Sequence, residues 1–559
     1  MSARYPRPPT REPRADPSVS RPPNSSQQAY TDDLLRQDFD AAKDWCYTGV
    51  GVLEWDAKMR DYLKNNDWRY PIVAREGTDV DAMDMHVQEV VTLRDMLLSF
   101  EDPAAVVRLL AAPSTKIVSL TITEYGYRVP LNEGDHKLLE LANQGVLDDP
   151  ELSMPESIDA ACAKATVFGL ILAALAARHR LGRRPFTVMS CDNLPHNGEV
   201  AKKRVISAAR DAPECDDALC AWLEEEVRYP STMVDRITPA TSPQDIADLK
   251  ERTGIDDAWP VMCEPYKHWV IEDDFVDGQR PAWERVGALL VPDVRPHELM
   301  KVRLLNVTHS AICYVGSLAG LTHVHEAVTH KMIKPFLRRL MTKEIAASLV
   351  ADPTMPGELL AVLDEYVDLV LSRFENVAVK DTLDRVAMDG SEKFRVQGRE
   401  VIMERLAREG TVRGFALYVA SWAHFLRSKV RAGEKIKDAS AGLVTAPWEM
   451  DKENMGGTAG LEAFLDIEEI FGVLARHEGW REAVKREFLD IDQAGLEATL
   501  LGAIFGVGHN SNADLSSLER ARERASGTFA LDEMCVADTI ETDEWRADDE
   551  AAVFVSLEA

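Results

Sequence analysis

The chain has 559 residues, and its 64 basic and 94 acidic residues give a formal net charge of −30. This length exceeds what one ordinary hydrophobic core can hold, so two large domains are expected. The negative charge repels phosphate backbones and anionic membranes, which argues against a nucleic-acid partner and against binding at a membrane surface.

The eight cysteines are scattered along the chain without any Cys-x-x-Cys pair. The sequence therefore indicates neither a zinc knuckle nor a compact disulfide framework, and reduced thiols fit best. No apolar run reaches the roughly 20 residues that a bilayer requires, and no signal-type apolar core follows the N-terminus. We expect a cytoplasmic protein.

Residues 1–25 contain seven prolines and five arginines among small polar residues. Such a composition cannot bury a core, so a disordered arm is predicted. The arginines are also typical of an organelle transit peptide, but the prolines, Glu12 and Asp16 disfavour the amphipathic helix that such a peptide needs.

From residue 26 to 288, helical and β-rich runs alternate, which is typical of an α/β layer around a parallel sheet. Strands are predicted at 44–52, 70–74, 116–123 and 184–190, and helices at 56–64, 85–99, 157–180 and 199–210. Polar residues follow the strand that ends at Ser190. Ligands of open α/β sheets bind outside the carboxyl ends of the strands, so these residues are well placed.

Helical periodicity dominates from His297 to about Arg524, which predicts an all-α domain over residues 289–528. The remaining segment, 529–559, is acidic, with ten carboxylates after residue 529 against the single basic residue Arg546. We interpret it as a solvated tail or a loosely docked terminal element.

The first helix of this second domain carries Lys301, Asn306 and His309. At about 100° per residue, Asn306 lies roughly 140° and His309 roughly 80° around the helix from Lys301, so one face holds an amine, a carboxamide and an imidazole. Burial lowers the pKa of a lysine toward the range of a general base. On this helix alone, a solvated polar edge is the more ordinary interpretation.

Six blocks in the chain resemble those of the mannitol dehydrogenase family, the polyol-specific long-chain dehydrogenases. In the order and spacing of that family, they lie at residues 119–124, 190–198, 234–239, 269–283, 301–310 and 381–393. The resemblance as a whole covers roughly residues 27–480, and six blocks in order identify the chain as a member. The resemblance implies a Rossmann-like first domain and a mostly α-helical second domain.

The resemblance also implies an activity: zinc-independent, NAD(P)-linked interconversion of a sugar alcohol and a ketose, with D-mannitol and D-fructose as the expected pair. Oxidation of a secondary alcohol requires a base, donors for the developing alkoxide and a hydride acceptor. By resemblance, Lys301 is the general acid/base, Asn193 and Asn306 form the oxyanion site, and His309 orients the substrate hydroxyl.

Further residues are carried over to the substrate site. Asp235, Arg385 and Lys393 match positions that line the polyol site of the family. No metal is expected, because the lysine takes the role that zinc has in other alcohol dehydrogenases. His323 and His325 are interpreted as ordinary packing, since alternate residues of a helix do not share a face.

The chain departs from the family at the cofactor site. Gln27 and residues 30–35 match the end of the family's first block, but a proline-rich arm replaces the first strand and the glycine-rich loop that cradle the pyrophosphate. Asp56, with Glu54 as the alternative, is expected to meet the adenosine ribose, which favours NAD over NADP. Thr121 and Glu124 are the other candidate cofactor residues.

Two alternatives stay open. The substrate could be a uronate, as in fructuronate and tagaturonate reductases, which calls for a further cation at the open end of the site. The chain could instead be a family member that binds cofactor poorly and acts as a binding protein, because the first strand and glycine loop are replaced. The resemblance to the family implies a monomer with a small-molecule polyol or ketose substrate, and no nucleic-acid or membrane partner is expected.

Overall fold

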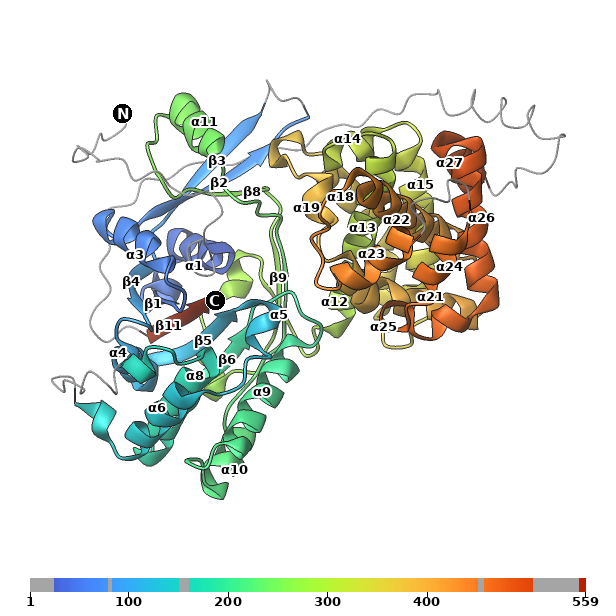
Figure 1. The fold of residues 1–559 in the computed structure, drawn as a ribbon. Coiled ribbons are helices and arrows are strands. Elements are labelled where there is room, and N and C mark those ends of the chain that lie inside the picture. Colours follow the sequence, from blue (N-terminus) through green and yellow to red (C-terminus); the bar gives the residue numbers. More distant parts are fainter. Residues whose placement is uncertain (1–24, 79–82, 150–159, 451–456, 506–551, 559) are drawn as a thin grey trace. The chain divides into compact units, whose positions relative to one another are not determined.

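The computed structural model describes residues 25–78, 83–149, 160–450, 457–505 and 552–558 (Figure 1). The chain divides into two compact units, the first formed by Met1–Arg75, Asp84–Val294 and Thr542–Ala559, and the second by Glu76–Met83 and Arg295–Glu541. The first unit is α/β and the second is helical, in agreement with the predicted order of the two domains. The predicted disordered arm falls almost wholly outside the described residues.

A five-stranded sheet forms the centre of the first unit, with the strand order β4-β1-β11-β5-β6. Its strands are β1 (Trp45–Gly51), β4 (Leu93–Leu98), β5 (Thr115–Thr121), β6 (Thr187–Ser190) and β11 (Ala552–Glu558). All four neighbouring pairs are parallel. Parallel strands are usually covered on both faces, which explains why β1, β5 and β6 are almost continuously buried.

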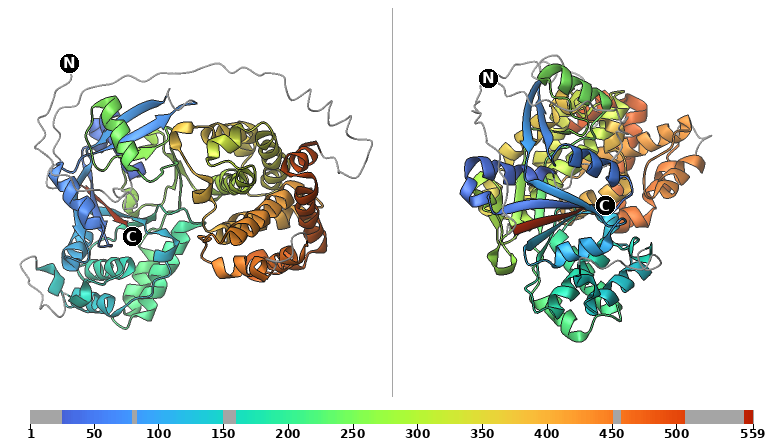
Figure 2. Two further views of the ribbon diagram at one scale, coloured as in Figure 1. Left: turned by 45° about the horizontal axis from the view of Figure 1, so that its top comes forward. Right: turned by 90° about the vertical axis from the view of Figure 1, so that its left-hand side faces the viewer.

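The central strand comes from the far end of the sequence. β11 lies between β1 and β5, so that Val555 is opposite Thr48 on one side and Val118 on the other. Figure 2 shows this dark red strand among the blue strands. Within the acidic segment predicted over 529–559, residues 552–558 thus form a strand instead of a solvated tail. The physical reason is local composition, because nine of the ten carboxylates precede residue 552 and an apolar run follows.

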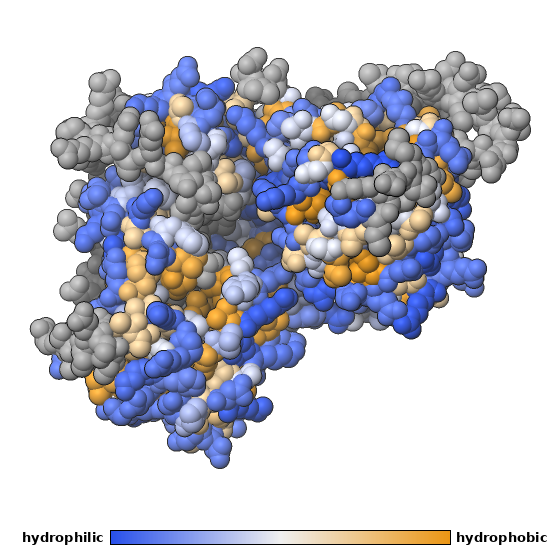
Figure 3. All heavy atoms as spheres, in the orientation of Figure 1, coloured by the Kyte–Doolittle hydropathy of each residue, from blue (hydrophilic) through white to orange (hydrophobic). Residues whose placement is uncertain are grey.

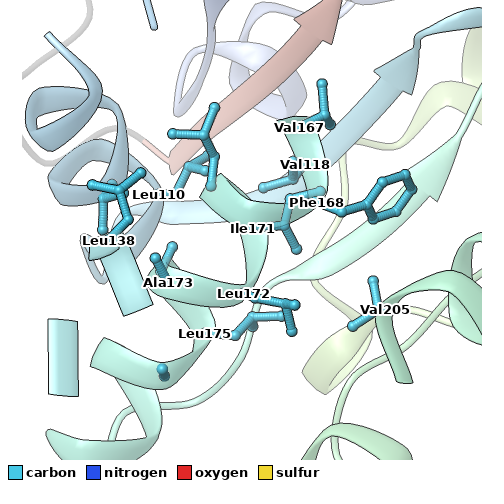
Figure 4. Packing of buried hydrophobic residues seen from close by; sticks show 14 of the residues in the cluster. Leu110, Val118, Leu138, Val167, Phe168, Ile171, Leu172, Ala173, Leu175 and Val205 are labelled. Carbon is cyan, nitrogen blue, oxygen red and sulfur yellow. The ribbon is translucent and has the colours of Figure 1, made fainter. Parts of the chain in front are cut away.

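Helices pack on the sheet, and their apolar residues form the larger hydrophobic core of the first unit together with residues of the strands. The helices of the first unit are α1 (Ser25–Gln37), α2 (Phe39–Ala42), α3 (Asp56–Asn65), α4 (Pro103–Ala111), α5 (Thr123–Gly126), α6 (Glu133–Asn143), α8 (Val167–Arg180), α9 (Asn197–Asp211), α10 (Asp217–Glu225) and α11 (Pro243–Thr253). Leu110, Leu138, Ile171 and Val205 from four of these helices pack around Val118 of β5 (Figure 4). Helix α8 is apolar on all sides from Val167 to Ala177, as a fully buried stretch of helix must be.

Two three-stranded sheets complete the first unit. One has the strand order β3 (Asp84–Val90), β2 (Tyr70–Glu76) and β8 (Val261–Cys263). The other has the strand order β10 (Leu289–Val291), β9 (His268–Glu272) and β7 (Thr232–Asp235). The predicted helix over 85–99 is wrong, since β3 and β4 occupy this range. The buried carboxylate of Asp32 accepts hydrogen bonds from Val91 N (2.8 Å) and Thr92 Oγ1 (2.9 Å), which fixes the break between the two strands. This contact across 59 residues overrides the local periodicity.

The second unit consists of helices. They are α12 (Arg295–Met300), α13 (Val307–Leu318), α14 (Val324–Thr329), α15 (Ile333–Arg339), α16 (Ala346–Val350), α17 (Gly357–Ala361), α18 (Leu363–Phe374), α19 (Leu383–Val386), α20 (Gly390–Lys393), α21 (Arg399–Ala407), α22 (Arg413–Ala432), α23 (Ala441–Met450), α24 (Ala459–Leu465), α25 (Glu468–Phe471), α26 (Glu478–Ala494) and α27 (Leu496–Phe505). Tyr314 of α13 stacks on Tyr418 and Trp422 of α22 at the centre of its core.

The face of the molecule that Figure 3 shows is mainly polar. Figure 3 shows hydrophilic residues over most of the visible face, with apolar residues scattered between them. Among the described residues, no helix is both long enough and apolar enough to cross a membrane.

Candidate active site

Lys301 stands at the beginning of a π-helical segment. This segment, Lys301–Asn306, joins α12 to α13, and Val307 N–H donates to the carbonyl of Val302, five residues back. Lys301 is 6% exposed, so its ammonium group does not belong to a solvated edge. A π turn holds more residues than an α turn, which brings Asn306 closer around the axis to Lys301 than the predicted 140°. π segments of this kind occur often at functional sites.

Two further π segments, Leu340–Ile345 and Phe394–Gly398, pack against the one that holds Lys301. The segment is also anchored by Arg303, whose guanidinium makes two 2.8 Å hydrogen bonds to Glu404 and one of 3.1 Å to Ser348 Oγ. Because these contacts bind three elements together, the widened turn has a fixed place in the helical unit.

His309 follows one turn later, on α13, and lies in a charged cluster. Its Nε2 is 3.5 Å from Asp381 Oδ2, and its ring stacks on Phe374 at 4.8 Å between centroids. A separation of 3.5 Å is at the outer limit for a hydrogen bond, so the contact is mainly electrostatic. Arg385 holds the same carboxylate through Nε and Nη2. Asp381 therefore joins two residues that were predicted for the substrate site.

Burial sets the protonation of this cluster. Burial lowers the pKa of His309, and the charge of Asp381 opposes that shift only in part, so the imidazole is neutral at neutral pH. Burial alone would raise the pKa of Asp381, but its contacts with His309 and Arg385 outweigh this and hold the pKa below the usual range. The cluster thus consists of a neutral imidazole, a carboxylate and a guanidinium.

Lys393 lies at the end of α20, and its Nζ donates to the carbonyl of Val386 at 2.8 Å. Burial lowers its pKa, and the charge of Arg385 lowers it further. His309 and Cys313 also interact electrostatically with this amine. The structure therefore brings His309, Arg385 and Lys393 together in the second unit, around a carboxylate that sequence reasoning did not assign.

The other predicted substrate and catalytic residues belong to the first unit. Asn193 is exposed just after β6, and Asp235 is buried at the end of β7. Asn197 ties these two strand ends together, since its amide donates to the carbonyls of Asp192 (2.9 Å) and Thr232 (2.8 Å) and accepts from Thr232 N (2.9 Å). These bonds hold the strand end that precedes Asn193 beside β7.

Asp192 connects the same strand end to β5. Its carboxylate accepts hydrogen bonds from Thr123 N (2.9 Å), Ile122 N (3.2 Å) and the Tyr127 hydroxyl (2.7 Å). Burial raises its pKa, although these donors act in the opposite direction. The turn that carries the candidate cofactor residues Thr121 and Glu124 is therefore fixed by the neighbouring strand.

The candidate cofactor residues lie at or just beyond the carboxyl ends of the parallel strands. Thr121 and Gly51 end β5 and β1, and both are opposite Glu558 of β11. Asp56, predicted to meet the adenosine ribose, is buried and accepts a 3.0 Å hydrogen bond from Leu53 N. A Cβ on Gly51 would lie 2.6 Å from the Cβ of Asp56, so only glycine fits there.

The sheet fits a dinucleotide at this edge. All its strands are parallel. From the central strand β11, successive strands are placed toward one edge of the sheet from β1 to β4 and toward the other edge from β5 to β6, so the order of strand placement reverses at β11. Dinucleotides bind at such a reversal, outside the carboxyl ends of the strands. Glu54, the alternative ribose contact, is exposed just beyond the end of β1.

The two histidines interpreted as ordinary packing are not alternate residues of one helix. His323 precedes α14 in an extended conformation, and its ring stacks on that of His325 at 5.2 Å. With Glu326 they place three potential metal-ligand atoms within 4.8 Å of one another. The Glu326 carboxylate, however, accepts hydrogen bonds from Thr322 N and His323 N, both at 2.8 Å, as a helix cap does.

Sequence reasoning missed two contributors to the site. Asp381 stands four residues before Arg385, a spacing that favours an ion pair on a helical turn and could have indicated it. Arg303 lies within the predicted catalytic helix, but nothing in the local sequence indicates that it pairs with Glu404, 101 residues away.

Family comparisons match both units. The mannitol dehydrogenase Rossmann domain matches residues 27–285, and the mannitol dehydrogenase C-terminal domain matches residues 293–492. The chain belongs to the mannitol dehydrogenase family. The resemblance seen in the six sequence blocks, and the Rossmann and helical domains that it implied, are thereby confirmed.

Relatives cover most of the chain. Mannitol 2-dehydrogenase of Emericella nidulans is 37% identical over 451 residues, which are 79% of this chain and 83% of the relative. That of Pyrenophora tritici-repentis is 37% identical over 412 residues, or 73% and 68% of the two chains. Among solved structures, the ternary complex of Pseudomonas fluorescens mannitol 2-dehydrogenase with NAD and D-mannitol is 34% identical, with a TM-score of 0.68, and the match covers 85% of this chain and 90% of that one.

A second solved structure that is similar to this chain has a different sugar alcohol in its name. It is a D-sorbitol dehydrogenase in substrate-free form, 30% identical, with a TM-score of 0.69, and the match covers 87% of this chain and 96% of that one. The fold and helical unit are thus shared by proteins that are named for different sugar alcohols.

Proposed function

We propose that this mannitol dehydrogenase family member is an NAD-linked polyol oxidoreductase that interconverts D-mannitol and D-fructose. Support comes from the relatives named mannitol 2-dehydrogenase and from the related structure that contains NAD and D-mannitol. The observation that carries the mechanism is Lys301, buried at the start of a π turn that also holds Asn306.

In the oxidation, Lys301 accepts the proton of the secondary hydroxyl, and Asn306 and Asn193 donate hydrogen bonds to the developing alkoxide. His309 is neutral, so it can donate to or accept from a substrate hydroxyl without adding charge. Bound NAD supplies the hydride acceptor. The sheet edge that carries Asp56, Thr121 and Glu124, with Glu54 as the alternative ribose contact, would hold this cofactor. The base is an amine, so the proposed proton transfer needs no metal ion.

Lys301→Ala tests this role. We expect turnover to fall by at least a hundredfold, in keeping with the contribution of a general base. Affinity for NADH should stay within about twofold of that of the unmodified chain. Lys301 belongs to the helical unit, whereas the sheet edge proposed to hold the cofactor belongs to the first unit. Equal loss of turnover and of NADH affinity would show that the substitution disrupts the fold and would contradict the assignment.

Substrate choice is tested by comparing mannitol, arabinitol, sorbitol, fructose and fructuronate. A uronate needs an available cation, whereas the Arg385 guanidinium is already engaged by Asp381. We therefore expect turnover with the neutral polyols and with fructose. Activity confined to uronates would overturn the proposed substrate.

The alternative of a cofactor-deficient binding protein is tested by titration with NADH. Saturable binding at or below millimolar cofactor supports the enzyme. Absence of binding in that range would favour a binding role for the family fold.

A further inference from the structure

The strand at the centre of the nucleotide-binding sheet is separated in the sequence from the other strands of that unit by the segment Arg295–Glu541 of the helical unit. β11 follows the helical unit in the sequence and returns to pair with β1 over seven residues and with β5 over six. No other described strand lies between β1 and β5. The sheet of the first unit therefore depends on a segment that is 431 residues after the end of β5.

This strand occupies the position that matters most for a nucleotide. The order in which successive strands are placed in the sheet reverses at β11, and the crevice at such a reversal receives the dinucleotide. Glu558 lies opposite Gly51 on one side and Thr121 on the other. The carboxyl end of β11 is thus flanked by the ends of the two strands that carry the candidate cofactor contacts.

β11 also belongs to the core. Val555 is fully buried in the cluster that contains Val118 of β5 and the apolar residues of α8. Without β11, the facing edges of β1 and β5 would lose their backbone hydrogen-bond partners on that side, and unpaired backbone groups in a buried sheet are costly. The two edges cannot keep their present positions with the slot between them empty.

We propose that insertion of residues 552–558 between β1 and β5 forms one wall of the cofactor crevice and makes the first unit competent to bind NAD. This rests on the proposed function for the identity of the ligand. Since β11 is encoded after the helical unit, the nucleotide-binding sheet is completed only after the helical unit has been made. Cofactor affinity is then controlled by whether this strand is inserted.

Val555→Asp in the full chain tests the inference, because a carboxylate opposes insertion at a fully buried position. NADH affinity should fall at least tenfold. In hydrogen–deuterium exchange, amides of β1 and β5 should exchange faster, whereas those of α13 and α22 in the helical unit should not change. The matched control is Val473→Asp, which makes the same chemical change at a position that is 62% exposed in the helical unit.

A synthetic peptide of residues 552–558 distinguishes loss of the strand from general misfolding. Added to the Val555→Asp chain, it should restore slow exchange in β1 and β5 and restore NADH binding. Unchanged NADH affinity and unchanged exchange in the variant would overturn the proposal. So would lost binding that is accompanied by faster exchange in both units and is not restored by the peptide.

Exchange and cofactor binding separate this inference from the proposed function. One outcome is exchange protection of β1 and β5 that depends on Val555 in a chain that binds no NADH. That result would support strand insertion as a structural event. It would overturn both the link between the strand and the cofactor and the proposed NAD-linked activity. Saturable NADH binding that is indifferent to Val555 would leave the proposed activity standing and overturn the strand's role.

Discussion

Asp381→Asn is the sharpest test of the helical unit's charged cluster. The amide keeps the shape of the side chain and removes its charge. The side chain of Asp381 is 5% exposed, whereas that of Arg385 is 52% exposed, so water can replace part of the lost ion pair. Hydrogen bonds to charged groups contribute about 1.5–3 kcal/mol. With discounting for this exposure we expect a loss of about 1–2 kcal/mol in the free energy of unfolding.

In a unit of this size, the loss corresponds to a fall in melting temperature of about 2–8 °C. The measurement is thermal unfolding at pH 8, with the polyol KM and kcat determined at saturating NAD. The polyol KM should rise, because Arg385 loses the partner that orients it. The control is Asp384→Asn, since the side chain of Asp384 is 74% exposed and meets Lys429 at 3.3 Å. A melting temperature and polyol KM equal to those of the control would refute the reasoning.

The same variant should change the dependence of stability on pH. The folded pKa of His309 lies below its ordinary value of 6.5, so just below pH 6.5 the unfolded state binds more protons. The stability contributed by the neutral imidazole is therefore present above pH 6.5 and is lost as pH falls toward the folded pKa. Removing the charge of Asp381 lowers that pKa further, so Asp381→Asn should lose more stability between pH 6.5 and 5 than the unmodified chain. Parallel pH profiles would contradict this.

Two further substitutions test the supports of the site. Arg303→Ala leaves Glu404 without its partner in a site where the arginine is 4% exposed, and should destabilise the helical unit by about 3 kcal/mol in denaturant unfolding. The control is Arg476→Ala at an exposed ion pair, which should change the free energy of unfolding by less than about 0.5 kcal/mol. Equal effects of the two substitutions would contradict the anchoring role of Arg303. Gly51→Ala forces a Cβ against Asp56, and should cost about 1–3 kcal/mol and weaken NADH binding; a neutral result in both assays would show that β1 adapts at its carboxyl end.

Much of the site could be predicted from local sequence. The spacing of Lys301, Asn306 and His309 placed them on one helical run, and the apolar strand before Cys191 placed Asn193 beyond a strand end. Such inferences succeed because helical periodicity and strand ends depend on neighbouring residues. The family resemblance then supplied the roles, which stay predictions for Lys301, Asn306, His309 and Asn193 until the variants are measured.

The π turn and the two strands within 85–99, which sequence reasoning missed, depend on partners that are distant in sequence. The π turn at Lys301 is anchored through Glu404, and Asp32 breaks the range 85–99 into two strands. Neither partner lies within the window that local periodicity can read. The energetic terms that decide them, buried hydrogen bonds and ion pairs, exist only after the chain has brought these residues together.

By itself, the sequence determined the two-domain division, the α/β and helical character of the domains, and the family. Only the tertiary structure decided what stands at the centre of the nucleotide-binding sheet. The apolar run 552–557 has strand character in the sequence, but its partners β1 and β5 lie more than 400 residues earlier. Strand pairing at this separation is set by which buried edges are left unpaired in the folded unit, a property that no local pattern contains.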